Sequence, residues 1–168
     1  MVRKGQGEQD WGRWIALAAD VGVLLGLILV IIQLRQNAAL DRAHTRHELA
    51  MGVVDLLDTP AANPQLASVL RRGGAGEPLT ADEQFQFRLR SNALLRLWED
   101  VHYQYRQGLY DQSEFDSHRA AWRDTLVQSV GFRRYWCEVR NLYSPQFAAQ
   151  MNSLMSQPCS AILARKAG

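Results

Sequence analysis

The feature that most constrains this chain is an apolar run near its N-terminus. Residues 14–34 form a stretch of 21 residues that only Asp20 and Gln33 interrupt. As an α-helix this stretch is ~31 Å long, which matches the hydrocarbon thickness of a bilayer. A polar segment that is compatible with a helix follows it, rather than a small-residue cleavage site, which argues against a signal peptide. The sequence therefore predicts one uncleaved transmembrane helix.

Two features of this span predict contacts with other transmembrane helices. Small residues recur every four positions, at Ala18, Gly22 and Gly26, and such a face lets another helix approach closely, although glycine is also common in spans generally. Asp20 points away from that face, and an aspartate within a bilayer costs ~2.5–3.5 kcal/mol on insertion scales. A donor on a neighbouring helix would offset this cost; protonation, water or Arg13 is the alternative. We expect a homo-oligomer or a larger membrane protein complex.

The helix is expected to continue beyond the membrane as a rod. Apolar residues recur at helical spacing from Leu40 to Leu57, and Pro60 ends the pattern. The residues expected to make contacts just outside the bilayer are Leu40, His47, Ala50 and Val54. The predicted segments are a tail at 1–13, the span at 14–34, a juxtamembrane extension of the same helix at 35–58, a helical bundle at 59–156 and a C-terminal tail at 157–168.

The remainder of the chain predicts a small bundle of helices. Helix starts are indicated at Asn63–Pro64, at the capping box Thr80–Glu83, at Asp111 and at Ser144–Pro145, and helix ends at Gly73 and Gly108. No segment shows the sustained period-two alternation of a strand, so the predicted fold class is all-α. A cofactor site built from Trp98, Tyr105, Trp122 and Trp136 is conceivable, but aromatic stripes at helical spacing are typical of core packing.

Few residues suggest catalysis. The chain has no nucleophile elbow, P-loop, dinucleotide fingerprint or zinc-type cysteine cluster. Glu99 with His102, and Asp41 with His44, match the acid-x-x-His spacing by which bundle helices supply di-iron ligands. With 17 acidic residues in 168, such matches arise readily by chance, and Glu99 is expected to face solvent, opposite the apolar stripe of its helix. We therefore predict no metal and no cofactor.

Charge and cysteine content bear on partners and compartment. The chain has 19 basic and 17 acidic residues, and this near balance argues against nucleic acid as a partner. Its two cysteines, Cys137 and Cys159, fit a reducing compartment, although a pair between them stays open. Three basic residues lie near each end of the span, so the positive-inside rule gives no orientation. The absence of a cysteine framework favours a cytoplasmic C-terminal domain on a bacterial inner membrane.

Three stretches together resemble a known group of proteins. They are "LVIIQLRQNAAL", "WEDVHYQYRQGLYD" and "GFRRYWCEVRNLYSPQF", and they are similar to a widespread family of uncharacterised bacterial proteins with one N-terminal span. The family pattern has an acidic residue early in the span, an "IRQN"-like exit at Leu34–Asn37, "YQYRxGL" at Tyr103–Leu109, and an aromatic pair at Tyr135–Trp136 followed by "SPxF" at Ser144–Phe147.

This resemblance covers most of residues 14–155. It implies a membrane-anchored helical protein and transfers no catalytic residue. Relatives more often carry an aromatic residue where this chain has His102, which weakens the metal hypothesis. The sequence therefore predicts a non-catalytic accessory or interaction subunit that docks onto itself or onto a larger membrane complex. The alternative is a metal- or haem-binding enzyme or redox module that uses Glu99, His102, Asp41 and His44.

Overall fold

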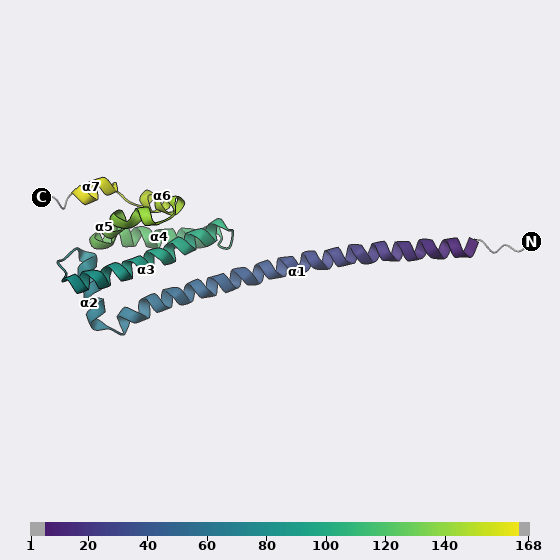
Figure 1. Cartoon of the computed structure of the whole chain (residues 1–168), viewed down its shortest axis with the longest axis horizontal. Helices are drawn as coiled ribbons and strands as arrows, with labels where there is room; N and C mark the ends of the chain where they lie inside the picture. The colour runs from purple at the N-terminus through teal and green to yellow at the C-terminus, as the bar shows by residue number, and fades with distance from the viewer. Residues whose placement is uncertain (1–5, 165–168) are drawn as a thin grey trace, which may run out of the picture. The chain divides into compact units, whose positions relative to one another are not determined.

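The computed structural model describes residues 6–164, and within them it contains helices but no β-strand. The elements are α1 (Gln6–Ala61), α2 (Pro64–Ala75), α3 (Ala81–Arg106), α4 (Gln112–Gln128), α5 (Val130–Val139), the 3-10 helix η1 (Arg140–Leu142), α6 (Pro145–Ser153) and α7 (Cys159–Ala164) (Figure 1). The all-α prediction is confirmed for these residues. The chain divides into two compact units, Met1–His44 and Thr45–Gly168, each of which is described by itself.

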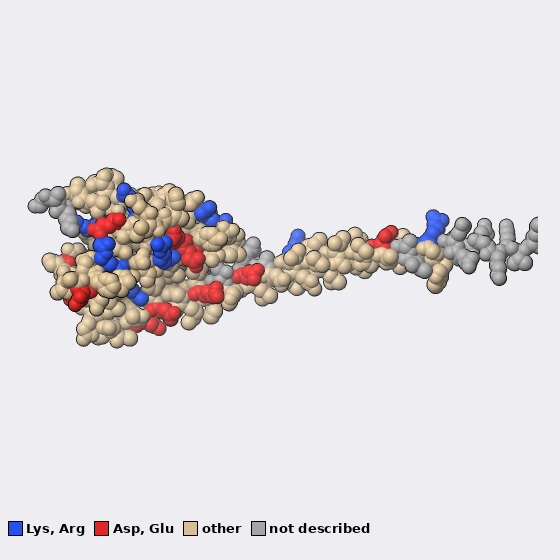
Figure 2. Space-filling model, viewed as in Figure 1, with Lys and Arg blue, Asp and Glu red and all other residues tan. Residues whose placement is uncertain are grey.

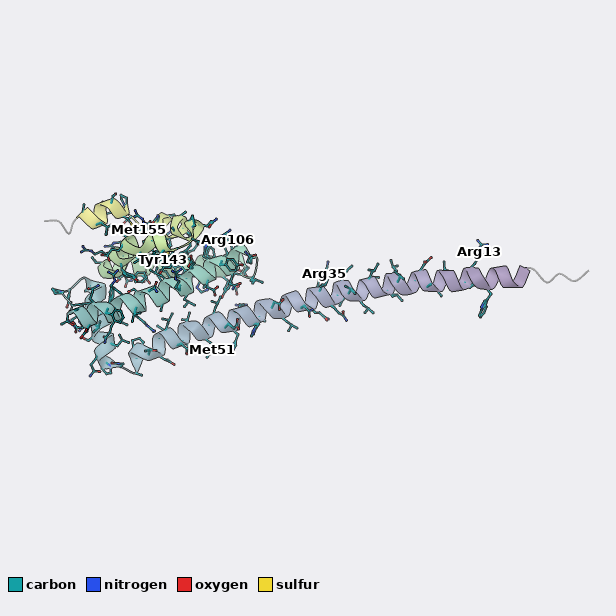
Figure 3. The ribbon with its side chains drawn as sticks, in the orientation of Figure 1. Arg13, Arg35, Met51, Arg106, Tyr143 and Met155 are labelled. Atoms are coloured by element: carbon teal, nitrogen blue, oxygen red, sulfur yellow. A yellow bond between two sulfur atoms is a disulfide. The ribbon has the colours of Figure 1, made fainter. Side chains whose placement is uncertain are left out.

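The first unit contains one helical stretch, Trp11–Asn37, that is long and apolar enough to cross a membrane. Every side chain from Leu17 to Asn37 is exposed in the isolated chain. Figure 2 shows few charged side chains on the described part of this stretch, and Arg13 and Arg35 lie near its two ends (Figure 3). The helix begins at Gln6, within the segment predicted to be a tail, and residues 1–5 lie outside the described part. A rod that joins the membrane to the second unit stays a prediction.

The second unit is built around α3. This helix packs against α2, α4, α5 and α6, and α5 in turn contacts α2, α4 and α7. Capping residues fix the helix starts locally: the Asn63 side chain accepts from the Leu66 N–H, and Thr80 and Glu83 form the predicted capping box. The core contains the aromatic stripes predicted from sequence. Trp98 stacks on Trp122 with ring centroids 5.4 Å apart, and Trp122, Trp136 and Phe147 are almost fully buried.

The last turns of α1 belong to the second unit and pack against it through a face that differs from the predicted stripe. Leu49 is buried, and a Cβ at Gly52 would lie 3.4 Å from Leu97 Cδ1. Arg46 forms an ion pair with Glu114 of α4. His47, Ala50 and Val54, which are predicted to contact a partner, stay exposed beside this face.

Two predicted boundaries differ from the structure. Gly73 does not end α2; the helix continues to Ala75, and Gly76 adopts the left-handed conformation at φ 81° that closes it. The segment 157–168, predicted to be a tail, contains α7, which is bonded to α5 through a disulfide between Cys137 and Cys159. Residues 165–168 of that segment lie outside the described part of the chain.

Candidate functional site

The small face of the apolar helix is open. Ala18, Gly22 and Gly26 are all exposed, and a Cβ added at either glycine would meet no atom within 4 Å. Asp20 is exposed as well. Neither the small face nor the carboxylate is therefore covered by another described part of this chain. This unit therefore has two exposed features on different sides of one helix: a face of small residues and a carboxylate.

The predicted juxtamembrane contacts fall into both units. Leu40 lies in the first unit and is 68% exposed, whereas His47, Ala50 and Val54 lie in the second unit and are also exposed. The three residues of the second unit leave a mixed apolar and polar strip on α1 beside the Leu49 face. They are accessible, and a binding role for them stays a prediction.

Glu99 is not the solvent-facing carboxylate that the sequence suggested. Its side chain is 21% exposed, and it joins α3 to the start of α6. Oε1 accepts a hydrogen bond from the Ser144 N–H at 2.8 Å, and Oε2 accepts one from Arg96 Nη1 at 2.7 Å. Burial works to raise the pKa of Glu99, but the hydrogen bonds from Ser144 and Arg96 outweigh it, so the pKa lies below its usual value. Helical periodicity missed this role because the partner lies 45 residues away.

His102 is buried in the aromatic core. Its ring centroid lies 6.0 Å from that of Phe115 and 5.8 Å from that of Phe147. Burial lowers the pKa of His102, and the positive charge of Arg106 at the end of α3 (Figure 3) lowers it further, against a smaller opposing effect of Glu99. Glu99 and His102 border one pocket of about 310 Å³ with Arg96, Arg106 and Ser144. His102 packs between aromatic rings and Glu99 accepts hydrogen bonds from two donors, so the contacts of both residues hold helices together.

The two acid-x-x-His pairs lie in different units of the chain. Asp41 and His44 lie in the first unit, and Glu99 and His102 lie in the second. Among the described residues, no group of three or more His, Cys, Asp or Glu side chains is placed to hold a metal ion. The metal- or haem-binding alternative therefore stays a prediction without a ligand set to support it.

The cysteine pair is the feature that sequence reasoning left open. Cys137 of α5 and Cys159 of α7 are each 4% exposed, their Cα atoms are 5.2 Å apart, and their sulfur atoms are bonded. This separation lies within the ordinary range for a disulfide. Two cysteines 22 residues apart gave no spacing signal, since only the turn between α6 and α7 returns the chain to α5.

Three comparisons with known proteins found no match. No protein-family model, no curated protein and no solved structure matches this chain. Function is therefore argued from the chain's own residues.

Proposed function

We propose that this protein is a membrane-anchored, non-catalytic accessory or interaction subunit that docks through its N-terminal helix onto other transmembrane helices. The observation that carries the proposal is the open face at Ala18, Gly22 and Gly26 together with Asp20 on another side of the same apolar helix. Close helix approach needs small residues. A carboxylate inside a bilayer needs a donor, water or a proton. A neighbouring helix on each side meets both needs.

The proposal predicts which single substitutions break the assembly. In protein purified from source cells in mild detergent, Gly22→Leu and Asp20→Leu should each sharply reduce the partner recovered, whether that partner is a second copy or another membrane protein. Val21→Leu adds bulk on a third face and should leave recovery unchanged. Native mass spectrometry gives the composition. Elemental analysis and an absorption spectrum of the same preparation test the metal alternative.

Equal recovery for wild type, Gly22→Leu and Asp20→Leu would contradict docking through this helix. A lone monomer in the wild type would contradict it as well. If Val21→Leu reduced the recovered partner as strongly as Gly22→Leu, any added bulk in the span would disrupt docking. The proposed small face would then have no special role.

The orientation is part of the same proposal. The cytoplasmic placement rested on the absence of a cysteine framework, and that premise fails because Cys137 and Cys159 are bonded. Disulfides persist in oxidising compartments and are rare in the cytosol. The balanced basic residues beside the span do not oppose either orientation. The domain that contains α2–α7 is therefore proposed to lie on the oxidising, outer side of the inner membrane.

This orientation predicts the thiol state in living cells. Cells are quenched with acid to trap the thiol state, and the protein is treated with a maleimide-coupled polymer that labels free thiols. Wild-type protein should migrate more slowly on a gel only when it is first reduced. The Cys137→Ala variant keeps a single thiol and should shift without reduction, which controls for labelling. Protease added to intact spheroplasts should cut the domain. Free thiols at quenching, or cleavage only after lysis, would contradict the orientation.

A further inference from the structure

A small apolar cavity lies between the last turns of α1 and the helices α2–α5 of the second unit. Its volume is about 260 Å³. Aliphatic and aromatic side chains make most of its wall, among them Leu56 of α1, Leu70 of α2, Leu94 of α3 and Phe132 of α5. Ligand sites in proteins are typically concave and mostly apolar, with a few polar groups that fix orientation.

Arg90 supplies the charged group in this wall. Its Nη2 atom is buried and has no hydrogen-bond partner among the residues whose side chains the structure describes. Two of the hydroxyl groups in the wall direct their protons elsewhere, since Thr125 Oγ1 donates to the Ala121 carbonyl at 3.0 Å and Ser129 Oγ donates to the Gly74 carbonyl at 3.2 Å. A buried donor without an acceptor costs free energy.

The position of Arg90 in an apolar wall favours an anion as its partner. Burial lowers the pKa of Arg90, because an apolar wall disfavours the charged guanidinium. A carboxylate that enters the cavity would remove this penalty, since it accepts hydrogen bonds from a guanidinium in a matching planar geometry. Most of the remaining wall is apolar and can pack against a hydrocarbon chain.

We infer that this cavity binds a single-chain aliphatic carboxylate, whose chain lies among Leu56, Leu70 and Leu94 and whose head group accepts hydrogen bonds from Arg90. The volume is close to the lower end of ligand pockets, ~300 Å³, so one short chain fits and a two-chain lipid does not. The site does not depend on docking through the transmembrane helix.

Octanoate and octanol have chains of the same length, so comparing them isolates the contribution of the head-group charge to binding. The full chain is placed in zwitterionic nanodiscs, and thermal unfolding is followed by near-UV circular dichroism of the core tryptophans. Octanoate should raise Tm saturably, by on the order of 5 °C at ten times its Kd. Octanol at the same concentration should give a much smaller rise, because it lacks the charge that Arg90 meets.

Variants assign the effect to this cavity. Arg90→Met should remove the difference between octanoate and octanol while the protein still folds, because the variant loses an unpaired charge. Arg71→Met removes an exposed arginine on α2 and should keep the full octanoate response. Leu94→Phe fills the cavity without altering charge and should lose the response to both ligands. Equal responses to octanoate and octanol in wild type, or an octanoate preference that survives in Arg90→Met, would overturn the inference.

Discussion

Gly131→Ala is expected to destabilise the bundle by about 3 kcal/mol or more, at the upper end of what overpacking costs. A Cβ at position 131 would lie 1.8 Å from the carbonyl oxygen of Gly73 and 2.9 Å from its carbonyl carbon. These are backbone atoms, so no change of rotamer relieves the clash and α5 must move away from α2. The Gly73 carbonyl also accepts the Gly76 N–H at 3.1 Å, so the displacement weakens the cap of α2.

Urea unfolding of the full chain in mild detergent, followed by near-UV circular dichroism, measures this loss. Two further glycines give matched comparisons. Gly73→Ala would meet the buried ring of Phe87 at 2.5 Å, which is a side chain rather than backbone and a longer contact than 1.8 Å, so its loss should be smaller than that of Gly131→Ala. Gly52→Ala lies within α1 with ordinary contact to Leu97 and should be neutral or stabilise by up to about 1 kcal/mol. Gly131→Ala with wild-type stability would show that α2 and α5 do not cross this closely.

The parts of the fold that follow from local chemistry were predictable from sequence. The capping box at Thr80 and Glu83, the Asp111 cap and the proline at the first turn of α2 act within four residues, so the sequence alone indicates them. The buried aromatic residues followed from helical periodicity for the same reason. Periodicity did not indicate that Leu49 is buried, because apolar residues occur on both sides of α1 and the contact with the bundle depends on residues distant in sequence.

The residues of the candidate sites depend on contacts that are distant in sequence. Glu99 was judged from its neighbours on α3, whereas its role comes from Ser144 at the start of α6. Arg90 carried no signal, since an arginine within a helix is ordinarily solvated and its isolation arises only when α1, α2 and α5 meet around it. The open face at Gly22 and Gly26 was visible in the sequence because it depends only on a spacing of four.

Removing the disulfide is expected to cost about 3 kcal/mol. The bond joins residues 22 apart, and closing a loop of this length restricts the unfolded chain by roughly that amount. Both half-cystines are buried where α7 packs on α5, so the bond also holds a helix of only six residues in place. Wild-type protein in a reducing agent should therefore unfold at a clearly lower urea concentration than the oxidised protein.

The double variant Cys137→Ala/Cys159→Ala distinguishes loss of the disulfide from any other effect of the reducing agent. It should be about as unstable as reduced wild type and should not respond to reducing agent. An unchanged midpoint for wild type whose thiols are shown to be free would contradict the prediction. A loss of about 3 kcal/mol lowers the folding equilibrium roughly a hundredfold, since 1.4 kcal/mol is a factor of ten. A domain with this dependence is more stable on the oxidising side of a membrane than on the reducing side, so the same measurement tests the proposed orientation.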